Sequence, residues 1–214
     1  MRLQVLMPQI GKLIPYEYEQ IKTPMYEDII EEQLSYGRAQ NSPYFLQISG
    51  IPGAGKSAFS RHHKDKDALY ISFDKIMEQL PDYQKDLEQY GSVEAFNRWE
   101  IPARVIGYEI LRRAVERNIN IKLEHSGVNE AHIELLKNLK ELGFKTEVDF
   151  ILCREDIAYQ RALEREQRTK RHTPKSLIEE RSAKVKEYLP KYKSIADTLN
   201  VYDTSHNHFN KINF

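Results

Sequence analysis

The sequence has a single cysteine and no long apolar run. Cys153 alone cannot form an intrachain disulfide or a cysteine-rich zinc site, and its place at the end of an apolar run favours a buried thiol. No uncharged apolar stretch approaches the roughly 20 residues that a helix needs to cross a bilayer. The apolar part of residues 1–8 is too short for a secretory signal. These absences predict a soluble protein of the cytoplasm, with no membrane partner.

The chain also lacks an excess of charge of either sign. Its 32 Lys and Arg residues balance 32 Asp and Glu residues. Proteins that coat nucleic acid need a broad cationic surface to displace counterions, so the balance argues against a nucleic-acid partner. The balance does not exclude a local basic pocket. The length of 214 residues and the 40% hydrophobic content fit one domain with an appendage.

Short apolar runs alternate with helical patterns after residue 43. The runs that predict strands are 44–49, 68–73, 119–123, 148–152 and 199–202. Helices are predicted from about residue 56, over about 92–117, over 133–142, and from the fourth strand to about 196. This alternation is typical of βαβ crossovers, so it predicts an α/β fold with a parallel sheet of about five strands between two helical layers.

The first 43 residues differ in composition, because four prolines interrupt them and they contain no β-branched run. Apolar residues spaced by three and four predict one helix over about 25–40. We therefore divide the chain into an N-terminal extension (1–43), an α/β domain (44–207) and a C-terminal tail (208–214).

Residues 50–57 match the phosphate-binding pattern G-x-x-x-x-G-K-[ST] in full. The three glycines let the backbone turn so that its N–H groups converge on phosphates, and the following helix adds its N-terminal dipole. Lys56 can reach the β- and γ-phosphates, and the Ser57 hydroxyl can bind Mg²⁺. The pattern predicts ATP and Mg²⁺ as cofactors. The expected nucleotide contacts are Gly50, Ile51, Pro52, Gly53, Ala54, Gly55, Lys56, Ser57 and Ala58.

Two carboxylates follow predicted strands, Asp74 after the second and Glu124 after the third. Because the carboxyl ends of parallel strands meet at one edge of a sheet, both are expected beside the phosphate-binding loop. Asp74 can accept a proton from an attacking hydroxyl or hold the water shell of the metal, although a helix cap is the structural alternative. Glu124 is expected to contact substrate or metal. His125 is given no role.

Six basic residues against two acidic ones lie between residues 161 and 175. A solvated helix face is the structural interpretation. The segment follows the fourth strand, however, where P-loop kinases carry a helical lid whose arginines stabilise charge on the transferred phosphoryl group. Together these features predict a kinase that phosphorylates a small hydroxyl compound.

The arrangement over residues 44–207 resembles the zeta-toxin family of P-loop kinases. The resemblance rests on the strand-end Asp74, on Glu124 with Ser126 two residues later, and on Arg-His-Thr-Pro-Lys at 171–175, which is similar to the Arg-x-Thr-Pro segment of the family. Such kinases use ATP and Mg²⁺ to phosphorylate a sugar hydroxyl of UDP-N-acetylglucosamine, and a small helical antitoxin usually holds them inactive.

The resemblance implies individual roles. Lys56 would bind phosphates, Ser57 the magnesium, and Asp74 would be the base. The implied acceptor contacts are Glu109, Glu124 and Ser126, and the implied charge-stabilising residues are Arg165 and Arg171. One position departs from the family motif Glu-Gly-Thr-x-Arg, because Val128 stands where an arginine grips the diphosphate of the nucleotide sugar.

Several alternatives stay open at this point. Val128 leaves room for a phosphotransferase that acts on another metabolite or an antibiotic. A different class of function is a nucleotide-binding interaction module with little turnover. The presence of Asp74, Arg165 and Arg171 argues against it. The N-terminal helix could cover the nucleotide site in cis, or it could be docked on the flank of the sheet. A toxin, an effector secreted into a host cytosol and a housekeeping kinase would share this sequence pattern.

Overall fold

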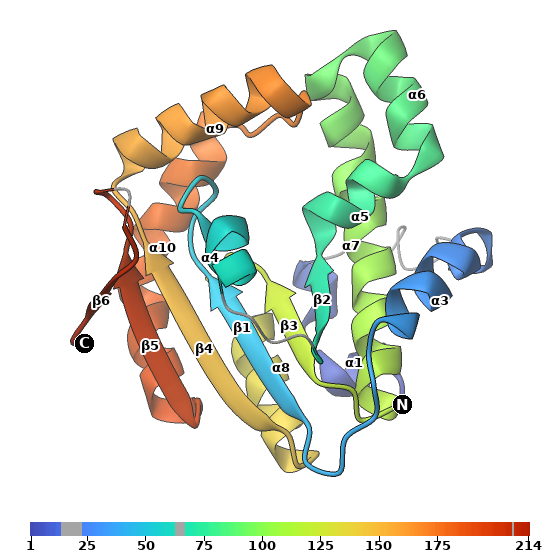
Figure 1. Ribbon diagram of the computed structural model, residues 1–214, viewed down its shortest axis with the longest axis vertical. Helices are drawn as coiled ribbons and strands as arrows, with labels where there is room; N and C mark the ends of the chain where they lie inside the picture. Colours follow the sequence, from blue (N-terminus) through green and yellow to red (C-terminus); the bar gives the residue numbers. More distant parts are fainter. Residues whose placement is uncertain (14–22, 63–66, 207) are drawn as a thin grey trace.

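The computed structural model describes residues 1–13, 23–62, 67–206 and 208–214 and contains one six-stranded sheet in the order β2-β3-β1-β4-β5-β6 (Figure 1). The strands are β1 (Tyr44–Ser49), β2 (Leu69–Ser72), β3 (Ile121–Glu124), β4 (Lys145–Leu152), β5 (Thr198–Asp203) and β6 (Asn210–Ile212). The first five are parallel, as predicted, and β6 runs antiparallel to β5. The exposed Asn-Lys-Ile of β6 carries no apolar run, so the sequence did not predict it.

Helices cover the sheet between the strands. They are α4 (Lys56–His62), α5 (Phe73–Gln79), α6 (Pro81–Tyr90), α7 (Ser92–Glu116), α8 (Glu130–Glu141), α9 (Glu155–Thr169) and α10 (Lys175–Ile195). Helix α9 passes over the carboxyl ends of the strands toward α6, which is the position of the predicted lid (Figure 1). Among the described residues, none of the helices is long and apolar enough to span a membrane.

Strand register brings the predicted site residues to one edge. Strand β1 is almost wholly buried, as expected for a strand covered on both faces. Glu124 at the end of β3 is paired with Ile48 of β1 and with Ser72 of β2. The loop that follows β1 and the residues that follow β2 therefore flank Glu124 at the carboxyl edge of the sheet.

The N-terminal residues form short α1 (Leu3–Leu6), two 3₁₀ turns (Ile10–Lys12 and Thr23–Tyr26) and α3 (Glu27–Ser35). The predicted helix over 25–40 is thus too long at its C-terminal end. Beyond Ser35 the chain becomes extended, because Ala39 bridges to Ile119 and the Gln40 N–H donates to the Asn118 carbonyl. Pairing with the chain just before β3 ends the helix.

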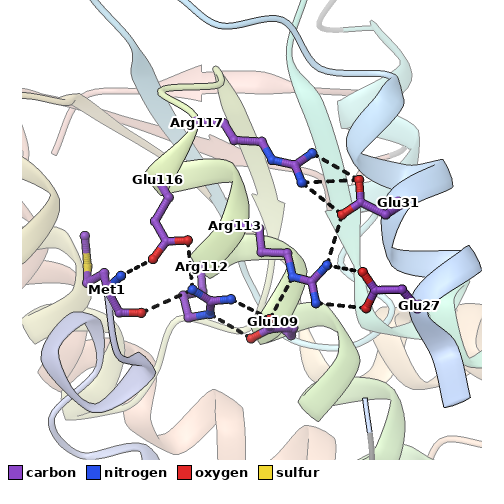
Figure 2. A network of polar contacts seen from close by, with 8 residues as sticks. All are labelled: Met1, Glu27, Glu31, Glu109, Arg112, Arg113, Glu116 and Arg117. Atoms are coloured by element: carbon purple, nitrogen blue, oxygen red, sulfur yellow. Dashed lines mark hydrogen bonds and ion pairs between the residues drawn. The ribbon is translucent and has the colours of Figure 1, made fainter. Parts of the chain in front are cut away.

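A network of ion pairs fixes α3 to α7 (Figure 2). The Arg113 guanidinium of α7 donates to Glu27 at 2.5 Å and to Glu31 at 2.9 Å, and Arg117 also donates to Glu31. Buried Ile30 and Leu34 complete the contact from the α3 side. The described part of the N-terminal extension is thereby docked on the flank of the domain. That position disagrees with a helix laid over the nucleotide site.

Replacing Arg113 by methionine is expected to lower the free energy of unfolding by roughly 1–2 kcal/mol. The change keeps the aliphatic stem but leaves Glu27, Glu31 and Glu109 facing one another without their shared cation. Urea unfolding measures the loss, and high salt should reduce it. Arg117→Met is the matched control, because Arg117 is far more exposed and contacts only Glu31 in this network. Equal losses in both variants would contradict a central role for Arg113.

Candidate active site

A cavity of about 360 Å³ opens at the carboxyl edge of the sheet. Its walls come from the phosphate-binding loop, from α5 and α7, from the end of β3, and from the lid helices α9 and α10. Among the residues singled out from the sequence, the structure brings together Lys56, Ser57, Asp74, Glu124, Ser126, Arg165 and Arg171.

The phosphate-binding loop has a backbone that other residues would not adopt. Gly53 has φ +82°, and a Cβ there would lie 2.0 Å from the Ala158 carbonyl oxygen. At Gly50 (φ +144°) a Cβ would lie 2.3 Å from the Ile151 carbonyl oxygen. Both glycines are therefore required by geometry. The Thr204 hydroxyl, at the end of β5, fixes the loop from below by donating to the Ala54 carbonyl at 2.8 Å.

Lys56 lies at the first position of α4 and points back over the loop. Its Nζ donates to the Ile51 carbonyl at 3.1 Å. Burial lowers the pKa of Lys56, while Glu124 and Asp74 act in the opposite direction. An ammonium held by a backbone carbonyl in a half-buried site is ready to exchange that partner for a phosphate oxygen.

Ser57, Glu124 and Tyr70 meet beside the loop. The Ser57 hydroxyl donates to Glu124 Oε1 at 3.0 Å, and the Tyr70 hydroxyl donates to Oε2. Glu124 is only 9% exposed, yet among the described residues no Lys or Arg lies within ion-pair distance of it. Burial, followed by the charge of Glu124, raises the pKa of Tyr70, so its hydroxyl stays protonated. Tyr70 was missed because a tyrosine in an apolar strand looks like a core residue.

This oxygen set fits Mg²⁺. P-loop proteins bind the ion with a serine or threonine hydroxyl and a nearby carboxylate that has no ion-pair partner. Phosphate oxygens and water complete the octahedral coordination. In the described part of the chain no three His, Cys, Asp or Glu side chains gather into a protein-only metal site, so the ion would need the nucleotide as a ligand. Glu124 also lines the cavity, so both the metal contact and the acceptor contact expected of it remain predictions.

Asp74 faces the lid. It lies in the first turn of α5, and its carboxylate is 3.5 Å from Arg171, which is also 3.3 Å from Glu78. Arg171 is 11% exposed and stands in the loop between α9 and α10. Arg165 donates to Thr173 in the same loop, and burial, then Arg171, lowers the pKa of Arg165. The guanidinium groups of Arg165 and Arg171 thus line the cavity together with the phosphate-binding loop. Each has a buried Nε with no hydrogen-bond partner among the described residues.

Glu109 does not reach the cavity, which corrects the role implied for it. It accepts hydrogen bonds from Arg112 and Arg113 on the outer face of α7 (Figure 2). Glu100 lines the cavity instead, ion-paired with Arg104. Glu100 and Glu109 are about two and a half helical turns apart, so they point to opposite sides of the helix. Glu100 is the acidic residue of this pair that faces the cavity, and comparison with the family motif did not single it out.

The cavity also carries side chains that the sequence did not single out. Arg181, on α10, donates to the Ser126 hydroxyl at 2.7 Å, and Arg104, on α7, lines the same cavity. Val128 is 2% exposed in the core, so it contributes nothing to the cavity. No local motif marks Arg104 or Arg181, because each is an isolated arginine in a long helix.

His125 also lines the cavity, and its ring is stacked on buried His132 with centroids 3.8 Å apart and planes at 5°. The His132 Nδ1–H donates to Gln47 and its Nε2 accepts from Tyr108, at 3.0 and 3.1 Å. Burial lowers the pKa of His132 to about 3, and burial together with His132 lowers the pKa of His125 well below its usual range. Both imidazoles are therefore neutral at physiological pH.

The sequence profile of zeta toxins matches residues 28–212, which is most of the chain. The chain belongs to the zeta toxin family. The match begins inside α3, earlier than the start of the domain placed at residue 44. It confirms the predicted resemblance and the predicted P-loop kinase fold, so the protein is a kinase-type phosphotransferase of zeta toxin type. No curated protein matches the sequence significantly.

Solved structures resemble the chain in fold. One from the PezAT chromosomal toxin–antitoxin system of Streptococcus pneumoniae has a TM-score of 0.74 at 14% identity, over 92% of this chain and 82% of that one. The AvrRxo1-ORF1:-ORF2 complex with ATP gives 0.65 at 11% identity, over 88% and 65%. A candidate kinase from Chloroflexus aurantiacus gives 0.55 at 17% identity, over 78% and 91%. At such identities the likeness shows the fold alone.

Proposed function

We propose that this zeta toxin family member transfers the γ-phosphate of ATP to a hydroxyl of a small molecule. The observation that carries the proposal is the position of Asp74, which faces Arg171 in the same cavity as Lys56 and Ser57. A base, a phosphate-binding loop and a cationic lid around one space are the parts that phosphoryl transfer needs.

The steps follow from these positions. The loop amides and Lys56 bind the β- and γ-phosphates. Ser57 and Glu124 would hold Mg²⁺, which would supply positive charge beside the phosphate oxygens. Asp74 accepts the proton of the acceptor hydroxyl. The hydroxyl oxygen forms a bond to the γ-phosphorus while the bond from that phosphorus to the bridging oxygen breaks, and ADP leaves. Arg171 exchanges its contact with Asp74 for the transferred group, where it and Arg165 stabilise the developing charge.

Replacing Asp74 by asparagine should lower the rate of transfer by about 10²–10⁴-fold, because the isosteric amide cannot take up the proton. The full-length protein is incubated with Mg²⁺-ATP and a metabolite extract, and ADP formation and phosphorylated products are measured by mass spectrometry. Asp82→Asn, in α6 outside the cavity, is the matched control. Equal product formation in wild type and Asp74→Asn would exclude Asp74 as the base.

For the acceptor we propose UDP-N-acetylglucosamine as the first candidate, from family membership. Burial of Val128 supports testing a second class, another metabolite or an antibiotic, because that side chain offers no diphosphate contact. Purified UDP-N-acetylglucosamine tested with Mg²⁺-ATP discriminates the two. Product from this substrate supports the first candidate, and product only from the extract supports the second.

We further propose that the kinase acts in a cytosol and that a small antitoxin protein binds it. The support is family membership and the likeness to a structure from a toxin–antitoxin system. Expression of the wild-type chain should arrest growth, Asp74→Asn should not, and co-expression of the antitoxin should relieve the arrest. Equal arrest by both chains would count against a toxic kinase activity.

A further inference from the structure

His125 lines the cavity but has no part in the transfer steps described above. Its Nδ1 accepts a hydrogen bond from the Gly127 N–H at 3.0 Å. A backbone N–H can only donate, so Nδ1 carries a lone pair and the proton of the neutral ring is on Nε2. No described residue accepts a hydrogen bond from Nε2, and this nitrogen is not sealed inside the protein. The imidazole therefore offers one N–H donor to the cavity.

The ring keeps this donor because it stays neutral. Burial, and after it the electrostatic effect of the neighbouring His132 and Arg181, lowers the pKa of His125. Protonation would also place a second N–H on Nδ1, directly opposite the Gly127 N–H. Two donors would then face each other without an acceptor between them. The contact with Gly127 and the surrounding charge thus favour the same tautomer.

A chain of buried hydrogen bonds holds the ring in place, and one backbone carbonyl fixes its direction. The Gly127 carbonyl can only accept, so the Tyr192 hydroxyl donates to it at 2.6 Å and must accept from the Gln47 amide at 2.8 Å. The Gln47 carbonyl then accepts from Nδ1–H of His132 at 3.0 Å. His125 stacks on this fixed ring. A donor oriented in this way loses little freedom when it binds a partner.

The side chains of Glu124 and His125 point to opposite sides of the sheet. Helix α4 joins β1 to β2 and helix α8 joins β3 to β4, and these two crossovers run in opposite directions along the sheet. Right-handed crossovers therefore put α4 and α8 on opposite faces (Figure 1). Glu124 accepts a hydrogen bond from Ser57 of α4, whereas His125 stacks on His132 of α8. The donor N–H of His125 thus comes from the face opposite α4, which carries Ser57.

His125 also lies against the start of α5, the helix that carries the proposed base. Its ring packs edge-on against Phe73 with centroids 5.7 Å apart, and Phe73 directly precedes Asp74. A Cβ on Gly107 would lie 2.4 Å from the Phe73 ring, so this ring is closely packed on α7. The position suits contact with the acceptor, whose hydroxyl Asp74 would deprotonate, better than contact with the nucleotide phosphates.

We propose that His125 is a specificity-determining residue for the acceptor, and that its Nε2–H donates to a hydroxyl or carbonyl oxygen other than the oxygen that becomes phosphorylated. A neutral N–H pairs with an oxygen lone pair, but it cannot pair with an ammonium group, which has none. The residue therefore favours polyhydroxyl or carbonyl compounds over amines at this position. The inference rests on the proposed kinase function and specifies one contact of its acceptor.

Initial rates of product formation over serial dilutions of one metabolite extract, at saturating Mg²⁺-ATP, test the contact. In His125→Asn the side-chain carbonyl can replace Nδ1 toward Gly127, but no group reaches the position of Nε2. The extract concentration that gives half the maximal rate should rise about fivefold or more, while the maximal rate and KM for ATP stay within twofold. His125→Gln, whose longer amide brings an N–H near the position of Nε2, should recover part of the loss.

His208→Asn, in the exposed tail, is the matched control and should behave like wild type. An unchanged half-saturating extract concentration in His125→Asn would overturn the proposal. A rise in KM for ATP would overturn it too, by assigning His125 to the donor site, and so would a fall confined to the maximal rate, by assigning His125 to the transfer step.

Nitrogen-15 spectra of wild-type protein labelled in histidine keep the test open if thermal melting shows that His125→Asn does not fold. They should show His125 neutral and protonated on Nε2 at pH 7. Its Nε2 resonance should shift when the extract is added together with Mg²⁺ and a non-hydrolysable ATP analogue. A proton on Nδ1, or no shift, would contradict the proposed contact.

The same measurements separate this inference from the kinase proposal. Product formed equally well by wild type and His125→Asn supports the kinase and overturns the contact. If wild type forms no product from any extract, the kinase proposal fails, and the Nε2 resonance decides the contact on its own. A shift then supports an oxygen compound bound at His125, and no shift overturns both proposals.

Discussion

Replacing Arg171 by alanine is expected to lower kcat by about 10³–10⁵-fold, the range found when an arginine that stabilises the transferred phosphoryl group is removed. The guanidinium is nearly buried and stands 3.5 Å from Asp74, where the acceptor hydroxyl and the γ-phosphate would meet. Its charge matters most when negative charge develops in the transition state, so KM for ATP should change far less than kcat. Steady-state ADP release measured over a range of ATP concentrations at saturating acceptor gives both constants.

Two further variants sharpen this expectation. Arg171→Lys keeps a charge but loses the planar fork, so it should recover only part of the lost rate. Arg154→Ala is the matched control, because Arg154 precedes the same lid helix, is exposed, and pairs only with Asp156 among the described carboxylates. A loss of kcat of less than tenfold in Arg171→Ala would contradict a role in stabilising the transition state. A loss expressed in KM for ATP would show instead that Arg171 binds the donor.

The buried His132 should make the fold sensitive to acid. Its pKa is about 3 in the folded chain, against about 6.5 in an unfolded one. Between these values the unfolded state binds the proton and the native state does not, so the free energy of unfolding falls as pH falls from 6.5 toward 3. Above pH 7 the ring is neutral in both states, so protonation of His132 no longer lowers the free energy of unfolding. By pH 4.5 this one residue should remove about 2–3 kcal/mol, and His125 acts in the same direction.

Urea unfolding at pH 7.5 and pH 4.5 measures this effect. His132→Gln should be less stable than wild type at pH 7.5, because it disturbs the contacts with Gln47 and Tyr108, but it should lose less stability on acidification. The difference between the two pH values is therefore the informative quantity. His208→Gln, at an exposed position of the tail, should behave like wild type. A wild-type loss that His132→Gln fully reproduces would assign the acid sensitivity to groups other than His132, such as His125 or the carboxylates.

The sequence predicted those parts of the fold and site that depend on local order. Alternating apolar runs predicted the five parallel strands, and strand ends placed Asp74 and Glu124 beside the loop from Gly50 to Ser57. The geometry of a parallel sheet makes such residues neighbours whatever their separation along the chain. For the same reason the lid arginines could be expected near the loop.

Residues that meet through helix packing could not be predicted in this way. Glu100, Arg104 and Arg181 reach the cavity because α7 and α10 turn particular faces toward it, and helix rotation is set by tertiary packing. Glu109 shows the converse, since matching to a family motif chose an acidic residue on the wrong face. The end of α3 was not predicted, because the chain after it pairs through Ala39 with Ile119, which is far away in the sequence.

The bond between Thr204 and the Ala54 carbonyl has a consequence for synthesis of the protein. It joins the phosphate-binding loop to a residue 150 positions later, and Arg161 also donates to the Thr204 carbonyl at 2.7 Å. A chain growing on the ribosome completes β1 and the loop early, but the loop gains this support only after β5 has emerged and paired with β4. We therefore expect the phosphate-binding loop to gain its full support only once β5 has paired with β4.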